Sequence, residues 1–234
     1  MTINPPTADY WSRIRRRKKL AITVSSIRLP IAMMAVHRSK RRDLIFADVA
    51  RWMRVRNIDA TPQRGLRILM ASAPEFRTLV YWRLGAIGNL IAPLAPGLRS
   101  LHILMSPDKV GPGLYIQHGD ATFMHCERVG SNAWLNQGVT LGYTNPTDSP
   151  TLGDNVTINA GAKVLGRVTI GDNVTVGANA VVLRSVPANA TVMAPTSRIL
   201  RRDDETTPGP SGNVPTAKSD VDQSPLSNTE KATA

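Results

Sequence analysis

Residues 152–187 read LGDNVT INAGAK VLGRVT IGDNVT VGANAV VLRSVP, a pattern that repeats with a period of six. Each hexad begins with an aliphatic residue, and its fifth position holds valine or alanine. Glycine, asparagine and aspartate occupy many of the positions between them. With one interruption after Leu141, the same pattern extends back to Val129 and forward to Met193. One residue pattern therefore covers residues 129–193.

A period of six fits neither an α-helix nor a simple strand. Helices repeat their apolar residues about every 3.6 positions, and simple strands alternate them over one short run. A sustained hexapeptide repeat is typical of stacked β-coils, in which each hexad forms a short strand and a turn. Glycine and asparagine accept the positive φ of such turns. Three hexads then form one coil, and inward aliphatic side chains stack on those of the next coil.

The repeat fails at two places. Ile116 and Val129 are thirteen residues apart instead of twelve, so one turn after His118 carries an extra residue. Leu141 and Leu152 are eleven residues apart, so residues 143–151 contain a five-residue excursion. Deviations from a repeat form loops, and loops on a rigid scaffold commonly carry functional sites.

The composition predicts one substantial domain with an appendage in 234 residues. The single cysteine, Cys126, excludes an intramolecular disulfide framework and fits a reducing compartment. We expect no signal peptide, since no small-residue cleavage site follows the basic N-terminal cluster, and no transmembrane helix, since no apolar run is long enough. These features predict a cytoplasmic protein.

The net charge of +12 is concentrated in residues 1–72, which hold 16 Lys and Arg against 4 Asp and Glu. Such a segment either attracts an anionic lipid, nucleic acid or phosphorylated substrate, or simply keeps the protein in solution. Aromatic residues are too sparse there for a base-stacking surface, so we predict no nucleic-acid partner. Peripheral contact with an anionic inner membrane face stays open as an alternative.

The sequence predicts four segments in a mainly β chain. They are a basic, largely disordered leader (1–42), a helical region (43–97), the β-helix (98–200) and a disordered tail (201–234). We expect Asp43 to cap a helix that turns Asp48 toward solvent. A second helix should follow Thr61-Pro62. A third should start at a Ser72-x-x-Glu75 capping box and end at Gly85.

His118 is the candidate catalytic residue. It lies one coil before the excursion, so we expect the adjacent coil to bring that loop close to it. A lone histidine is more often structural, and its position alone leaves both roles open. A zinc site is not expected, because His102, His118 and His125 lack the spacing of the γ-type carbonic anhydrases and Cys126 has no second cysteine.

The strings GLYIQHG (113–119), NQGVTLG (136–142) and GAKVLG (161–166) resemble the hexapeptide-repeat acyltransferases. Within them, residues 72–200 are similar to serine acetyltransferases and to O-acetyltransferases of polysaccharide biosynthesis. The resemblance implies a left-handed parallel β-helix, a homotrimer, and acetyl-CoA as donor without a metal. It implies that His118 acts as general base. It also implies that small residues line the groove for the pantetheine arm, here Gly142, Ala160 and Ala178.

The chain departs from the serine enzymes at the residues that serve the acceptor. Their catalytic histidine is oriented by an aspartate fifteen residues earlier, where this chain has Ile103. Asp120 or Glu127 could take that role, and we name Asp120 as the second catalytic candidate. An Arg-His pair that grips the serine carboxylate is replaced by Asp148 and Ser149.

Three functions therefore remain open. The first is acetylation of L-serine for cysteine biosynthesis. The second is acetylation of a sugar in a capsular, exopolysaccharide or lipid-linked glycan. The third belongs to another class, a non-catalytic trimeric scaffold.

Overall fold

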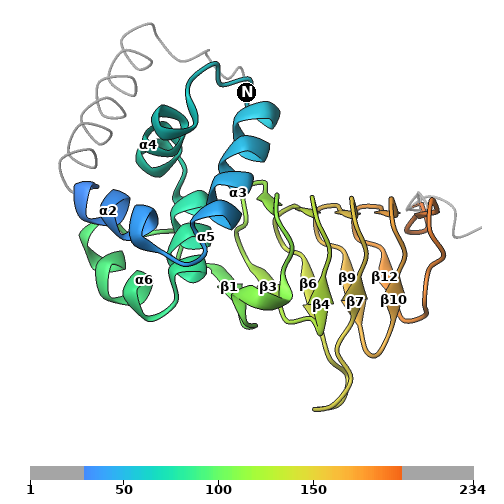
Figure 1. Cartoon of the computed structure of the whole chain (residues 1–234). Coiled ribbons are helices and arrows are strands. Elements are labelled where there is room, and N and C mark those ends of the chain that lie inside the picture. Colours follow the sequence, from blue (N-terminus) through green and yellow to red (C-terminus); the bar gives the residue numbers. More distant parts are fainter. Residues whose placement is uncertain (1–28, 197–234) are drawn as a thin grey trace, which may run out of the picture. The chain divides into compact units, whose positions relative to one another are not determined.

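The computed structural model describes residues 29–196. Within them, five α-helices and a short 3₁₀ helix precede a β-solenoid (Figure 1). The helical elements are α2 (Pro30–Arg38), α3 (Arg42–Val55), α4 (Pro62–Ser72), α5 (Pro74–Leu84), α6 (Ala86–Ile91) and η1 (Ala92–Leu94). None of the helices described is long and apolar enough to cross a membrane.

The solenoid consists of short strands in three parallel sheets. Sheet 1 contains β1 (Leu101–Ile103), β3 (Thr122–Met124), β6 (Thr140–Gly142), β9 (Lys163–Leu165) and β12 (Val181–Val182). Sheet 2 contains β2 (Tyr115–Ile116), β5 (Trp134–Leu135), β8 (Thr157–Ile158), β11 (Thr175–Val176) and β13 (Thr191–Val192). Sheet 3 contains β4 (Arg128–Val129), β7 (Thr151–Leu152) and β10 (Thr169–Ile170). A short 3₁₀ turn, η2 (Pro107–Lys109), lies between β1 and β2.

The register follows the hexads. Leu152 pairs with Ile170, and Ile158 pairs with Val176, eighteen residues further along in each case. From Val129 to Val182 the residues that open the hexads and those at the fifth position are buried, whereas Val186 and Val192 in the last coil are half-buried. The aliphatic repeat therefore forms the core of the coils, and the expected parallel β-helix is confirmed.

One corner of the coils is closed by an asparagine ladder. Asn132, Asn155, Asn173 and Asn189 all have positive φ, between 56° and 62°. Each of the first three donates its side-chain amide N–H to the side-chain oxygen of the next, at 3.2, 3.1 and 2.9 Å. Asparagine tolerates this backbone conformation better than most residues, and here its amides also satisfy one another. We call this the asparagine corner.

A buried ion pair fixes the helices to the first coil. Asp48 of α3 accepts hydrogen bonds from Arg83 Nε at 3.0 Å and from the backbone N–H groups of Gly113 and Leu114. Arg83 of α5 is fully buried and donates to the carbonyls of Val110 and Gly111. Burial raises the pKa of Asp48 to about 6, while the Arg83 charge and the N–H donors oppose that rise.

The buried pair corrects the expectation that Asp48 faces solvent. Helical spacing places Asp48 beside the apolar face of α3, and Arg83, 35 residues away, supplies the charge that allows its burial. The aromatic residue Trp52 packs on the same side and donates its indole N–H to Leu114 O at 2.8 Å. These contacts join α3 directly to β2.

The helix ends agree with the sequence in part. Thr61 caps α4 by accepting from Arg64 N, and Gly85, with φ of 65°, ends α5, as expected. The predicted capping box is wrong, because Ser72 ends α4 and bonds back to Ile68 O. Asp43 is not the cap of α3 but lies inside its first turn.

A helix also occupies part of the expected leader. Residues 30–38 form α2, with Ala32 and Val36 buried, so this part of segment 1–42 is not disordered. The apolar run there finds partners in α3, α5 and α6, which sequence periodicity did not reveal. The rest of the predicted leader before residue 29, and the predicted tail 201–234, lie outside the described residues.

Candidate active site

His118 lies in an enlarged turn between β2 and β3. Ile116 pairs with Leu135 and Met124 pairs with Leu141, so the first coil uses eight residues where the second uses six. The turn therefore has two extra residues, and the following turn to β4 has one fewer than the repeat. The single extra residue inferred from the sequence is the net result of these two changes.

The turn holds His118 outward. His118 has φ of 66° and an exposed side chain. The next residue, Gly119, has φ of 72° and is buried, and a Cβ there would approach Ile116 Cγ2 to 2.9 Å and Leu98 Cδ2 to 3.2 Å. Glycine thus allows the turn to press against the coil end, and His118 is presented beside that contact.

Asp120 is held by a different residue. Its Oδ1 accepts a hydrogen bond from Ser100 Oγ at 2.7 Å, and its backbone carbonyl accepts from Gly138 N. Glu127, the other carboxylate considered, pairs with Lys109 at 3.0 Å. Among the described residues no hydrogen bond to the His118 ring is formed. A carboxylate that orients His118 is therefore not part of this arrangement.

Ile103 occupies sheet 1 where the aspartate of the serine enzymes was expected by resemblance. It pairs in register with Met124 and is half-buried. The position serves packing at the first coil.

Two of the predicted groove residues follow His118 down the same corner. Backbone bonds from Gly138 N to Asp120 O, Gly161 N to Gln137 O and Asn179 N to Ala160 O place successive coils in register. The column that results runs from Asp120 through Gln137 and Ala160 to Ala178, and we call it the small-residue corner. Ala160 is half-buried and Ala178 is exposed.

Gly142 lies elsewhere. It ends β6, at the opposite edge of sheet 1, and its backbone is in register with Leu165. A Cβ at Gly142 would meet no atom closer than 3.8 Å within the chain. The structure therefore groups Ala160 with Ala178 but separates Gly142 from both.

The loop that contains the five-residue excursion, residues 143–150, also leaves sheet 1 at this opposite edge (Figure 1). Because the strands are parallel, His118 precedes them and the excursion follows them. Strands of three residues separate the two features by roughly 10 Å. The expectation that the adjacent coil brings this loop close to His118 within one chain is wrong. The two coils are neighbours, but His118 and the loop lie at different corners of them.

Asp148 organises the excursion internally. Its carboxylate accepts from Thr144 N at 2.8 Å, Thr144 Oγ1 at 2.5 Å and Asn145 N at 2.6 Å. The Thr144 hydroxyl, with help from these N–H groups, lowers the pKa of Asp148. Arg167 donates to Thr147 O at 3.0 Å, and Ser149 is half-buried. Asp148 therefore acts as the hub of its own loop.

An aromatic pair at the base of the excursion was missed from the sequence. The rings of His125 and Tyr143 meet edge to face with centroids 5.3 Å apart, and His125 Nδ1 lies 3.0 Å from Leu104 O. The sequence offered one signal for this pair. His125 directly follows the inward-facing Met124, so its side chain should point outward from the coil. Burial raises the pKa of the neighbouring Cys126 thiol, so it is no reactive thiolate.

The described residues contain no group of three or more His, Cys, Asp or Glu side chains that could hold a metal ion.

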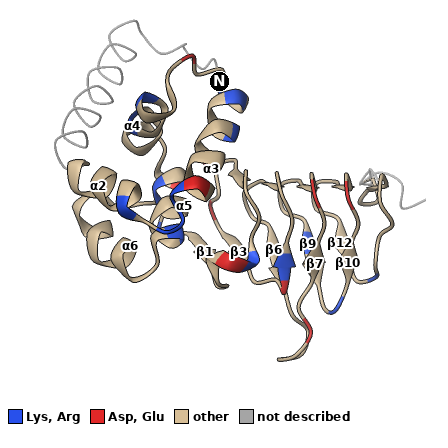
Figure 2. Ribbon diagram, viewed as in Figure 1, with Lys and Arg blue, Asp and Glu red and all other residues tan. Residues whose placement is uncertain are grey.

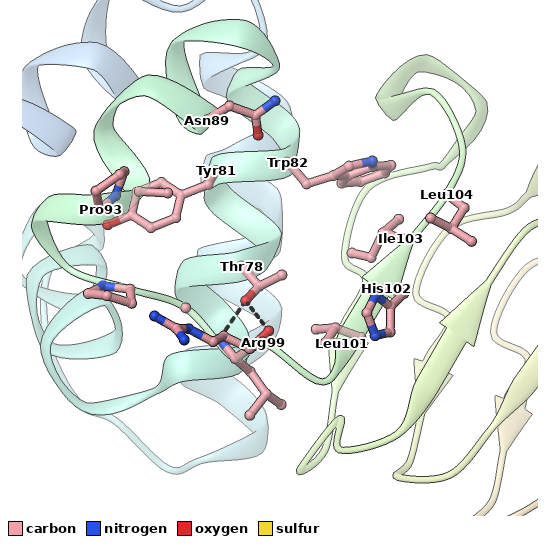
Figure 3. A pocket seen from close by; sticks show the side chains of 14 residues that line it. Thr78, Tyr81, Trp82, Asn89, Pro93, Arg99, Leu101, His102, Ile103 and Leu104 are labelled. Atoms are coloured by element: carbon pink, nitrogen blue, oxygen red, sulfur yellow. Dashed lines mark hydrogen bonds between the residues drawn. The ribbon is translucent and has the colours of Figure 1, made fainter.

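A cavity of about 580 Å³ lies between α5, η1 and β1 (Figure 3). Tyr81 and Trp82 line it, but their polar atoms already donate to Ala95 O and Met105 O. Arg99 and His102 also line it, from the segment that enters β1. This segment reaches the His118 turn through the bond from Ser100 to Asp120. The cavity is therefore linked to the His118 turn through this segment, and none of its lining residues belongs to the turn itself.

Stacked parallel hexads with interrupted turns define a hexapeptide-repeat β-solenoid. Residues 149–184 match the family model described as bacterial transferase hexapeptide (six repeats). In sequence, the chain is 34% identical over 157 residues to a serine acetyltransferase of Synechococcus elongatus, covering 62% of this chain and 64% of the relative. It is 46% identical over 99 residues to the Staphylococcus xylosus enzyme, covering 41% and 46%.

Solved structures agree on the fold. Serine acetyltransferase of Neisseria gonorrhoeae, in complex with serine, superposes with a TM-score of 0.56 at 20% identity, covering 82% of this chain and 98% of that one. The Brucella abortus enzyme gives 0.51 at 25% identity, covering 68% of each chain. The resemblance to hexapeptide-repeat transferases and serine acetyltransferases is thus confirmed. The chain spans less than two thirds of the length of the curated relatives above.

Proposed function

We propose that this protein is an acetyl-CoA-dependent O-acetyltransferase of the serine acetyltransferase type, with His118 as general base. The observation that carries the proposal is the enlarged turn at His118, which interrupts a regular corner and continues into the small residues Ala160 and Ala178. The similarity to named serine acetyltransferases supports the reaction class.

In the proposed reaction His118 removes the proton of an acceptor hydroxyl while that oxygen attacks the thioester carbonyl of acetyl-CoA. The tetrahedral intermediate then collapses with cleavage of the carbon–sulfur bond. The imidazolium returns the proton to the thiolate, so the products are the acetyl ester and free CoA. The exposed position of His118 leaves its ring accessible to both substrates.

The proposal includes a homotrimer. His118 and Ala160 lie at one edge of sheet 1, and Gly142 and the excursion lie at the other. A neighbouring copy that brings its opposite edge against the small-residue corner would unite all the predicted groove residues. Gly142 would then serve the site only in the assembly, whereas Asp120 lies in the same turn as His118 in each copy. Size-exclusion chromatography with light scattering tests this, and a monomer at assay concentration that is fully active would contradict it.

L-Serine is the proposed acceptor because of the named relatives. A sugar hydroxyl is the second candidate, and one observation favours it. Asp148 occupies a carboxylate-binding position by resemblance, yet it is an anion whose oxygens are held by its own loop. Residues 143–150 themselves contain no Lys or Arg that could bind the carboxylate of serine, and the cation that contacts this loop, Arg167, donates to Thr147 O.

The test is release of free thiol from acetyl-CoA with L-serine and with a panel of nucleotide sugars. We expect turnover with one acceptor class and a loss of about 10²–10⁴-fold in His118→Asn. Asparagine tolerates the positive φ of this turn, so the variant should keep its trimer and its thermal midpoint. A trimer without turnover on any hydroxyl acceptor would instead support the non-catalytic scaffold.

A further inference from the structure

Five large apolar side chains are exposed on helical elements that the proposed reaction does not use. Leu90 of α6 is the most exposed, at 80%, and the other four lie between 40% and 55%. They are Ile31 and Met34 of α2, Ile87 and Leu90 of α6, and Leu94 of η1. α2 contacts α6, and η1 continues directly from α6. We call these residues the α2–α6 face.

The α2–α6 face lies away from the coils. α5 stands between α6 and β1, and α2 and α6 are on the far side of α5 from the solenoid (Figure 1). The candidate site at His118 is built on the coil side. An occupant of this face would therefore leave the site free.

Charges around the face have one sign. Residues 29–42 and 84–100 hold five Lys and Arg and no Asp or Glu. Arg38, Lys40 and Arg42 are exposed, whereas Arg41 is paired with Asp108 at 2.7 Å. Figure 2 shows the cations beside α2 and an α6 without any charged residue.

The exposed apolar side chains and the surrounding cations together favour an anionic bilayer over a second copy of the chain as the binding partner of this face. Exposed isoleucine and leucine side chains on neighbouring helical elements are typical of interaction surfaces. A second copy docked symmetrically through the same face would bring like cations together. An anionic bilayer accepts the apolar side chains at its interface and attracts the cations around them. The preceding residues 1–28 add seven Lys and Arg against one Asp to the same end of the chain.

We propose that the α2–α6 face docks on the surface of an anionic lipid bilayer, with Ile87 and Leu90 inserted at the interface and Arg38 and Lys40 on the headgroups. The full-length protein should sediment with vesicles of phosphatidylcholine that contain one third phosphatidylglycerol. It should not sediment with pure phosphatidylcholine vesicles, and added salt should weaken binding.

Variants separate the face from the basic N-terminal residues. Ile87→Ser combined with Leu90→Ser should lower the vesicle partition coefficient by at least about tenfold, since each side chain loses its burial in the interface. Leu183→Ser, which replaces an equally apolar side chain exposed on the coils, should leave binding unchanged. If the double variant does not fold, Leu90→Ser alone removes the most exposed member and should give a smaller reduction.

A second pair of variants tests the charges. Arg38→Glu with Lys40→Glu should weaken binding to anionic vesicles by about tenfold, whereas Arg184→Glu on an exposed part of the coils should not. Thiol release with a water-soluble acceptor should stay the same in all of these variants.

Three outcomes would overturn the proposal. The first is equal binding to neutral and anionic vesicles or none to either. The second is full binding by the Ile87 and Leu90 variants, which would assign binding to residues 1–28 alone. The third is a change of oligomeric state in those variants when the unaltered protein does not bind vesicles either. That result would make the face a contact between copies.

Discussion

The asparagine corner and the small-residue corner turn the same coils through the same kind of backbone. Both contain positive φ at every coil, for example Asn173 at 58° and Gly161 at 73°. The asparagine corner fills its outer space with amides that bond to one another. At the small-residue corner the residues of positive φ are Gly138, Gly161 and Asn179, and Ala160 and Ala178 stand directly before the last two.

This difference separates a structural corner from a candidate binding corner. An amide ladder satisfies its own donors and acceptors, so it has little left to offer a ligand. Alanine contributes no polar group and little volume, so a ligand can lie close to the backbone. The same corner also contains the only enlarged turn between sheets 2 and 1 in the described coils, at His118. Four changes test the contrast.

The largest expected effect concerns the buried Asp48–Arg83 pair, which holds the first coil at Gly113, on the side of the asparagine corner. Asp48→Asn leaves the Arg83 guanidinium buried without its carboxylate, which should cost about 3–5 kcal/mol of unfolding free energy. Urea unfolding followed by circular dichroism measures this. Asp108→Asn breaks the exposed pair with Arg41 and should change stability little. Equal losses in both variants would contradict the role of the buried pair.

The next effect compares two glycines in the small-residue corner. Gly119→Ala places an alanine in the left-handed region of φ and brings its Cβ too close to Ile116. We therefore expect the free energy of unfolding to fall by about 3 kcal/mol. Gly138→Ala, one coil later, has φ of 67° but no atom closer than 3.6 Å to the added carbon, and should lose about 1 kcal/mol. Thermal midpoints give the ranking. A larger loss at Gly138 would mean that the His118 turn is not tightly packed.

The asparagine corner is tested by two substitutions at Asn173. Asn173→Ala removes two ladder bonds and leaves a positive φ to alanine, for an expected loss of about 2 kcal/mol. Asn173→Gly loses the side-chain hydrogen bonds but adopts positive φ without strain. Its free energy of unfolding should therefore fall by only about 1 kcal/mol. Both variants should retain thiol release. Loss of activity at constant stability would show that this corner, too, contacts substrate.

The smallest change tests ligand approach with a matched pair of alanines. Ala178 and Ala188 are both exposed, and each precedes an asparagine of positive φ, but they lie on different corners. Ala178→Arg should raise the KM for acetyl-CoA about tenfold, which corresponds to roughly 1.4 kcal/mol. Ala188→Arg should leave KM unchanged. If neither variant affects KM, the donor does not lie along the small-residue corner.

Much of the fold was accessible from the sequence because it is local. The hexad spacing predicted the coils, the excursion after Leu141, and the turns at Gly and Asn, since six consecutive residues contain one strand and one corner. The ends of helices at Thr61 and Gly85 were also readable from local chemistry. Ser72 misled because a capping motif and a bond back to Ile68 compete for the same hydroxyl.

The candidate site was predictable only as single residues. His118 was identified from its place in the repeat, and the structure places it with an exposed side chain in the enlarged turn. The sequence did not show that Asp120 would be held by Ser100 or that Asp148 would bind its own loop. Each carboxylate could accept hydrogen bonds from several nearby donors. Which donor it binds depends on the three-dimensional positions of those groups, and the spacing in the sequence does not give them.

The sequence by itself determined that this chain forms parallel coils, because a period of six can bury its aliphatic residues in no other simple way. Only the tertiary structure decided which corners meet and which lie apart. It placed His118 and Gly142 at opposite edges of one sheet, and it joined Asp48 to Arg83 across 35 residues. The physical reason is that strand direction and the burial of a charge are settled by the whole packed assembly, whereas periodicity acts within a few residues.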